Sequence, residues 1–111
     1  MGGSADIAVL ERLFEVLKTR RGADPTESYT AALLAAGPEK IGGKLAEETA
    51  ETVEALLAGA SDRVAAESAD LLYHLLVLWT AAGIEPGDVW RELARREGTS
   101  GLAEKAARKT D

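Results

Sequence analysis

The chain has 111 residues, of which 46% are hydrophobic and 29% charged, so we expect a single domain over residues 1–111 with its own core. Its formal net charge of −6 argues against nucleic-acid binding, which needs a basic surface. The absence of cysteine excludes disulfides, thiolate zinc sites and cysteine nucleophiles. Aromatic residues make up only 5%, while alanine and leucine are frequent, which favours an all-α fold.

No membrane or secretion signal is visible in the sequence. The longest apolar run, residues 71–82, is interrupted by His74 and is too short to cross a bilayer. The first residues do not place a basic segment before a hydrophobic one, as a secretory signal does. We therefore expect a cytoplasmic protein with no membrane partner.

About five helices are predicted. In the first, apolar residues recur every three or four positions, which indicates an amphipathic helix over residues 6–20. Ser28 is a good N-cap for a short second helix that runs through Ala36 and stops at Gly37.

A longer third helix is expected from Pro38 to about Ala58, because proline suits the first helical turn. Gly42 and Gly43 interrupt this segment. Each glycine costs about 1 kcal/mol relative to alanine in a helix interior, so the helix could instead begin at Lys44.

A tight turn at Gly59 precedes the fourth predicted helix, for which Ser61 is a good N-cap. This helix runs over residues 62–82, and from Leu71 it is apolar on nearly every face, which indicates burial all round. A fifth helix starts at Pro86, and we expect its apolar residues to face inward, namely Val89, Trp90 and Leu93. Residues 1–5 and 98–111 are expected to be loosely ordered, the latter as a short helix or an arm.

The negative charge is concentrated in one stretch. Residues 47–70 contain seven acids and one base, whereas acids and bases are equal in number elsewhere. Two motifs lie in this stretch, an EExxE at Glu47, Glu48 and Glu51, and an ExxD at Glu67 and Asp70. Residues three apart share a helix face, so each motif projects two carboxylates in one direction.

The two motifs are in register across a helical hairpin centred on Gly59. Glu48 and Asp70 lie equally far from Gly59 in the sequence, and so do Glu51 and Glu67. An antiparallel hairpin therefore predicts four converging carboxylates.

Clustered carboxylates raise one another's pKa and are unfavourable when partly desolvated. A hard divalent cation removes this penalty, and all-oxygen ligation suits Mg²⁺ or Mn²⁺. The alternative is that these acids form a solvated helix face, in which Glu67 and Asp70 pair with Arg63 or a more distant base.

With these motifs the sequence resembles the MazG-like all-α nucleotide pyrophosphohydrolases. Its closer resemblance is to the phosphoribosyl-ATP pyrophosphohydrolases of histidine biosynthesis, and it covers almost the whole chain. Beyond the acidic motifs, the similar segments are Ser28 to Thr30, Lys40 and Ile41, Lys44, Asp70 to Val77, Ser100 to Leu102 and Glu104 to Ala106. The glycines at 42 and 43 depart from the helix-forming residues expected there.

The resemblance implies a hydrolase that cleaves the α–β phosphoanhydride of 1-(5-phosphoribosyl)-ATP, giving phosphoribosyl-AMP and pyrophosphate. The residues that match the metal ligands of the family are Glu48, Glu51, Glu67 and Asp70. Glu47 is then a candidate general base or supporting residue. Together with the ligand Glu48, it is a candidate catalytic residue. Metal ions would reconcile an acidic protein with a triphosphate substrate.

Candidate substrate-binding residues lie on both sides of the second predicted helix, namely Lys40, Lys44, Ser28 and Tyr29. The lysines could meet phosphates as point charges, or could only neutralise neighbouring acids one turn away. The hydroxyl groups could contact substrate, although Ser28 serves equally well as a helix cap. His74, the only histidine, is expected to be a satisfied core residue rather than a catalyst.

Three further expectations remain. One alternative function is a house-cleaning pyrophosphatase of non-standard nucleoside triphosphates, and another is a structural helical module whose acids only solvate a surface. The apolar circumference of residues 71–79 exceeds what a chain of this length can cover, so we expect a homodimer or a higher homo-oligomer. The family resemblance implies the same assembly.

Overall fold

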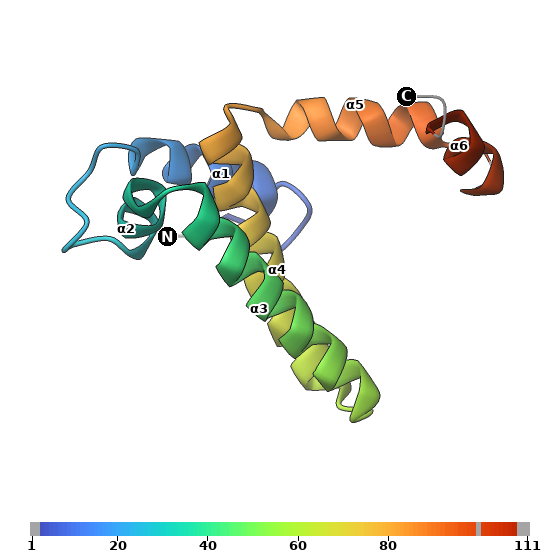
Figure 1. The fold of residues 1–111 in the computed structure, drawn as a ribbon, viewed down its shortest axis with the longest axis horizontal. Coiled ribbons are helices and arrows are strands. Elements are labelled where there is room, and N and C mark those ends of the chain that lie inside the picture. Colours follow the sequence, from blue (N-terminus) through green and yellow to red (C-terminus); the bar gives the residue numbers. More distant parts are fainter. Residues whose placement is uncertain (1–2, 100, 109–111) are drawn as a thin grey trace.

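The computed structural model describes residues 3–99 and 101–108, and within these ranges helices are the only regular elements, which confirms the all-α fold. Six helices are present there, where about five were expected, because the C-terminal region contributes one of its own (Figure 1). They are α1 (Val9–Thr19), α2 (Tyr29–Ala36), α3 (Pro38–Leu57), α4 (Ser61–Ala82), α5 (Pro86–Arg96) and α6 (Gly101–Arg108).

The two longest helices, α3 and α4, form an antiparallel hairpin that turns at Gly59, where φ is +66° and glycine is therefore favoured. Helices α1 and α2 pack against the end of the hairpin that lies away from this turn (Figure 1). Helix α5 leaves the bundle after α4, and α6 follows at its far end. None of the helices in the described ranges has the length and hydrophobicity that a bilayer crossing requires.

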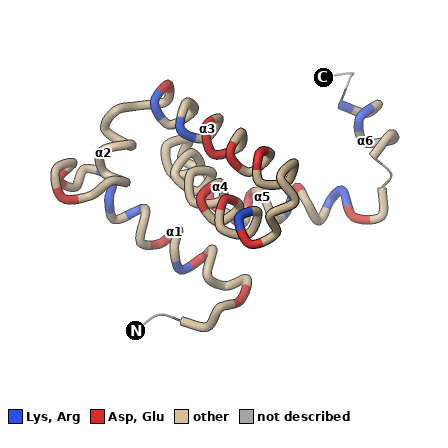
Figure 2. The backbone as a smooth tube through the Cα atoms, turned by 90° about the horizontal axis from the view of Figure 1, so that it is seen from below, with Lys and Arg blue, Asp and Glu red and all other residues tan. Residues whose placement is uncertain are grey.

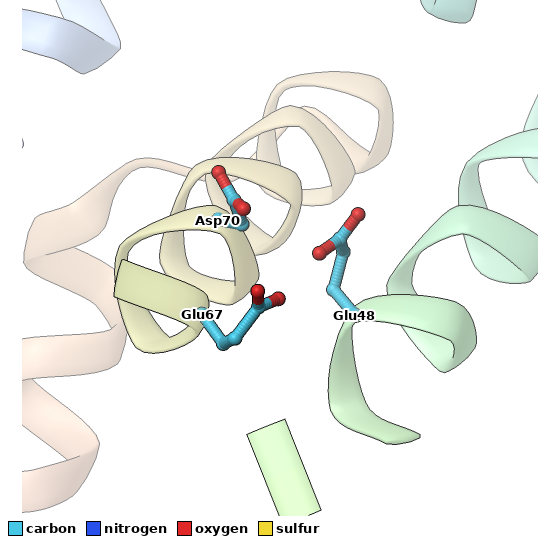
Figure 3. A group of neighbouring side chains, drawn as sticks. All are labelled: Glu48, Glu67 and Asp70. Atoms are coloured by element: carbon cyan, nitrogen blue, oxygen red, sulfur yellow. The ribbon is translucent and has the colours of Figure 1, made fainter. Parts of the chain in front are cut away.

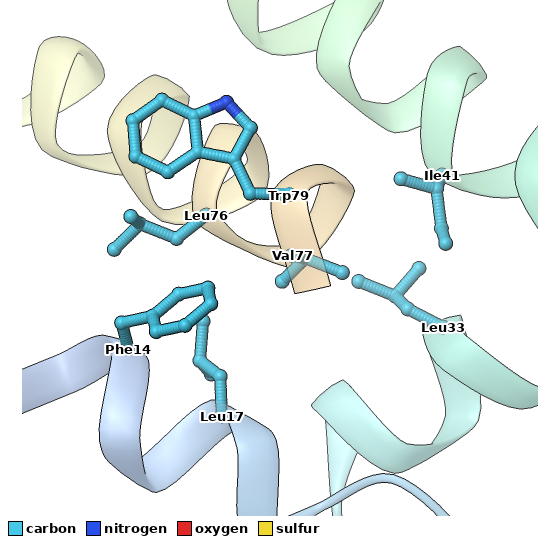
Figure 4. Packing of buried hydrophobic residues seen from close by; sticks show 7 residues of the cluster. All are labelled: Phe14, Leu17, Leu33, Ile41, Leu76, Val77 and Trp79. Atoms are coloured by element: carbon cyan, nitrogen blue, oxygen red, sulfur yellow. The ribbon is translucent and has the colours of Figure 1, made fainter. Parts of the chain in front are cut away.

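The hydrophobic core lies where α1, α2 and the start of α3 meet the second half of α4 (Figure 4). Its buried members are Phe14, Leu17, Leu33, Ile41, Leu76, Val77 and Trp79. The other half of the hairpin, toward Gly59, has few buried apolar side chains, and Ala55 is one of them. The core therefore holds one end of the hairpin firmly and leaves the acidic half at its edge.

Helix α3 begins at Pro38 and continues through both glycines, so the alternative start at Lys44 is wrong. A Cβ built on Gly42 or Gly43 would meet nothing within 4 Å, which means that no neighbour requires a glycine there. Ile41 lies one residue earlier and is buried in the core. Burial of this side chain contributes about 1.5–3 kcal/mol, which offsets the glycine cost.

Two other helix boundaries differ from the predictions, and one is confirmed. The first helix begins at Val9 instead of residue 6, because the Asp6 carboxylate accepts a hydrogen bond from the Ala8 N–H (3.0 Å) and forms a separate turn. The fourth begins with Ser61 itself, so Ser61 is not the N-cap. Ser28 is an N-cap, since its side chain accepts from the Ala31 N–H at 3.1 Å.

One expectation about burial was wrong. Leu93 is 53% exposed, because α5 extends away from the bundle instead of lying along it. Leu72 is 44% exposed, so a single copy leaves part of the apolar stretch of α4 uncovered, as expected for a chain of this length. Of the ends expected to be loosely ordered, residues 1, 2, 100 and 109–111 lie outside the described residues.

Candidate metal centre

Acidic residues gather along α3 and α4, as Figure 2 shows. The hairpin register brings three of them together. Glu48 projects from α3, and Glu67 and Asp70 project from α4, so that one oxygen of each lies within 4.8 Å of the other two (Figure 3). Glu48 and Glu67 are half-buried, whereas Asp70 is exposed. The cluster is therefore open to solvent on one side.

Glu51 lies one turn beyond Glu48 on α3 and borders this cluster without contributing one of the three converging oxygens. Its carboxylate is close enough to raise the pKa of both Glu48 and Glu67. The structure thus gathers three of the four suggested ligands and places the fourth beside them.

The electrostatics of Glu48 and Glu67 are unfavourable without a counter-charge. The pKa of Glu48 is raised by burial first and by the neighbouring Glu51 second. The pKa of Glu67 is raised first by contact with the Glu51 carboxyl and then by burial. The Oε2 atoms of both residues are buried and have no hydrogen-bond partner among the described residues. Such oxygen atoms fit the ligand chemistry of a hard divalent cation.

Glu47 points to a different partner. Its Oε2 lies 3.1 Å from the Nζ of Lys44, and this ion pair raises the pKa of the lysine. Lys40 and Lys44 line a shallow hollow of about 330 Å³, together with Gly43 and the acids Glu39 and Glu47. The structure therefore places Glu47 with the lysines instead of in the carboxylate cluster.

The hydroxyl residues of α2 have separate positions. Ser28 uses its side chain to cap α2, as described above. Tyr29 reaches α4, where its hydroxyl oxygen lies 3.1 Å from Nε2 of His74. The other ring nitrogen of His74, Nδ1, lies 2.8 Å from the backbone oxygen of Asp70. His74 is 6% exposed with both nitrogens bonded, as a satisfied core histidine should be.

The contact between Tyr29 and His74 was not anticipated from the sequence. The two residues are 45 positions apart on different helices, and helical periodicity carries no information about such a pair. Their only common signal was that both lie in segments through which the chain resembles one enzyme family.

Comparison with known proteins places the chain in that family. The model of the phosphoribosyl-ATP pyrophosphohydrolase family matches residues 10–97. The chain belongs to this family. Among its relatives is the phosphoribosyl-ATP pyrophosphatase of Azospirillum brasilense, 56% identical over 103 residues, which cover 93% of each chain. That of Parvibaculum lavamentivorans is 56% identical over 105 residues, which cover 95% of this chain and 96% of the relative.

All the residues of the candidate site lie inside the part matched to the phosphoribosyl-ATP pyrophosphohydrolase family. The match begins in α1 and ends just beyond α5, so it includes the hairpin, the core and the carboxylate cluster. Helix α6 lies outside it.

Proposed function

We propose that the chain hydrolyses the α–β phosphoanhydride of 1-(5-phosphoribosyl)-ATP to phosphoribosyl-AMP and pyrophosphate, the second step of histidine biosynthesis. The observation that carries this proposal is the convergence of Glu48, Glu67 and Asp70 in a chain that belongs to the phosphoribosyl-ATP pyrophosphohydrolase family. Two buried oxygens of this cluster have no hydrogen-bond partner in the part of the chain that the structure describes. Nucleotide substrates of biosynthesis are made inside the cell, which would place the enzyme in the cytoplasm.

The metal in this proposal is Mg²⁺, with Mn²⁺ as a substitute, held by Glu48, Glu51, Glu67 and Asp70. All-oxygen ligation in a chain without cysteine suits these ions. When bound, the ion would neutralise the substrate's phosphates and lower the pKa of a bound water. The acids would hold it at the solvent-facing edge of the hairpin.

The remaining site residues would bind and orient the substrate. Lys40 and Lys44 flank a hollow on α3 that Glu47 also lines, and they could meet phosphate oxygens. Lys44 would then exchange Glu47 for a phosphate, which frees the Glu47 carboxylate to accept a proton from the attacking water. Glu48, the second catalytic residue, would act as a metal ligand. Ser28 and Tyr29 would line the substrate site on the side of α2.

We also propose that the chain works as a homodimer or a higher homo-oligomer. The radius of gyration of the described residues is 16.1 Å, whereas about 13 Å is expected for a compact monomer of this length. Several large apolar residues of the hairpin are exposed, namely Val53, Leu56, Leu57 and Leu72. A second copy packed on the hairpin would bury them through a self-complementary contact.

An activity assay tests the proposed substrate. Purified chain would be incubated with Mg²⁺ and either phosphoribosyl-ATP, ATP or a non-standard triphosphate such as deoxyinosine triphosphate, and pyrophosphate release would be measured. We expect efficient cleavage of phosphoribosyl-ATP alone. Preferred cleavage of the non-standard triphosphate would instead indicate a house-cleaning pyrophosphatase.

A thermal titration tests the metal site independently of substrate. The unfolding midpoint should rise with millimolar Mg²⁺, because a ligand that binds only the folded chain stabilises it. The double variant Glu48→Gln/Asp70→Asn should lose this response. An unchanged midpoint for the parent chain would indicate a helical module whose acids are only solvated.

A further inference from the structure

The hydrogen bonds of His74 determine its tautomer. Nδ1 faces the backbone oxygen of Asp70 at 2.8 Å, and a carbonyl oxygen can only accept, so Nδ1 carries the proton. In the neutral ring Nε2 is then an acceptor. The group that faces it at 3.1 Å is the Tyr29 hydroxyl, which must therefore donate.

Aromatic packing holds this arrangement in place. The ring of Tyr73 meets His74 edge-on with centroids 5.1 Å apart, and Tyr29 meets His74 edge-on at 5.9 Å. Tyr29 and Tyr73 are stacked with centroids 6.3 Å apart. The hydroxyl of Tyr73 is hydrogen-bonded to Thr30, the residue after Tyr29. The first turn of α2 is thus attached to α4 at several points.

Tyr29 nevertheless remains 52% exposed, so its outer side faces solvent beside the proposed site. The residue whose backbone holds His74 is Asp70, a member of the carboxylate cluster. Through His74, Tyr29 is therefore connected to the turn of α4 that carries a member of the carboxylate cluster.

We infer that His74 is a positioning residue that orients the hydroxyl of Tyr29. The Tyr29 oxygen then acts toward the substrate as a hydrogen-bond acceptor, which suits a sugar hydroxyl and not a phosphate. The Tyr29 hydroxyl donates its proton to His74, so only the lone pairs of its oxygen are available on the solvent side. Ionised phosphate oxygens are themselves acceptors and cannot use them. A nucleotide with ribosyl groups offers hydroxyl donors of the required kind. This inference rests on the proposed function.

The tautomer can be measured without substrate. His74 is the only histidine, so ring ¹⁵N labelling and NMR give one set of imidazole signals. At about pH 8, where an ordinary histidine is neutral, we expect a protonated Nδ1 and an unprotonated Nε2. In Tyr29→Phe the Nε2 signal should move, because its donor is gone. A proton on Nε2, in the neutral or the charged ring, would overturn the inference.

The positioning role is tested by kinetics. Tyr29→Phe keeps the ring and removes the hydroxyl. His74→Asn keeps an amide donor near the Nδ1 position and removes the acceptor at Nε2. Loss of one neutral hydrogen bond should raise KM about three- to tenfold in each variant and leave kcat within about twofold. The double variant should be no worse than either single variant. Additive effects, or losses in kcat alone, would contradict the inference.

Substrate analogues that each lack one ribosyl hydroxyl identify the donor. For one of them, the parent chain and Tyr29→Phe should have equal KM values. If every analogue retains the full difference, Tyr29 does not accept from a sugar hydroxyl. Failure of the parent chain to cleave phosphoribosyl-ATP would overturn the proposed function instead, and the NMR result would still decide the tautomer.

Discussion

Glu48 and Glu67 bring ligand oxygens within 4.8 Å of each other across the α3–α4 hairpin, and each also buries an oxygen that has no hydrogen-bond partner among the described residues. Charge repulsion and desolvation both act against the ionised pair, and the pKa of each residue is raised accordingly. The metal-free protein should therefore be destabilised by the residues that we propose as ligands.

The first prediction concerns stability without metal. A carboxyl with an ordinary pKa of 4.5 in the unfolded chain and a higher pKa in the folded one binds more protons when folded. Stability should therefore fall as the pH rises above 4.5 and level off once the folded-state pKa is passed. Glu48→Gln should weaken this fall and raise the thermal midpoint at neutral pH, as followed by circular dichroism in chelator.

The matched control is Glu97→Gln, which replaces an exposed carboxylate at the end of α5. Its midpoint should follow that of the parent chain across the same pH range. The comparison is made above pH 4.5 because of Glu92, whose pKa Arg95 and Arg96 lower to about 2. The stability that this ionised carboxylate contributes is lost as the pH falls from 4.5 toward 2. Equal pH profiles for the parent chain and Glu48→Gln would contradict the prediction.

The second prediction separates the acids from His74 in catalysis. Glu51→Gln and Asp70→Asn should each reduce hydrolysis of phosphoribosyl-ATP by about a hundredfold or more, because loss of metal-based charge stabilisation costs several kcal/mol. His74→Asn should keep near-normal activity at saturating substrate. Initial rates with Mg²⁺ measure all three, and circular dichroism confirms that each remains helical. Near-normal rates in both acid variants would refute the metal site.

The third prediction concerns the glycines of α3. Gly42→Ala should stabilise the protein by about 0.5–1 kcal/mol, because alanine has the higher helix propensity and its methyl group would meet nothing within 4 Å. Gly59→Ala is the matched control and should destabilise, since φ there is +66°. Urea unfolding of both variants measures the difference. A loss of stability in Gly42→Ala would show that this glycine has a structural requirement.

The fourth prediction concerns assembly. Leu72 is 44% exposed on α4, so Leu72→Glu should shift a dimer to monomers without disturbing the core. Light scattering at micromolar concentration measures the mass, and the parent chain's midpoint should rise with protein concentration. Leu76→Glu provides the contrast, because Leu76 is buried within one copy and a charge there should unfold the chain. A monomeric parent chain with full activity would exclude the dimer.

Much of the fold follows from local patterns in the sequence. The apolar spacing of α1, the Ser28 cap and the turn at Gly59 depend only on residues a few positions apart. Once two helices meet at a tight turn, their register is determined as well. For this reason the approach of Glu48 and Asp70 could be predicted from their equal separation from Gly59.

Other features depended on contacts between distant helices. Sequence spacing could not show that Glu51 borders the carboxylate cluster without contributing one of its three converging oxygens. It also could not show that α5 leaves the bundle and exposes Leu93. The hydrogen bond from Tyr29 to His74 joins residues 45 positions apart. Helical periodicity determines which face a residue occupies, whereas the packing of one helix on another decides which side chains meet across that face.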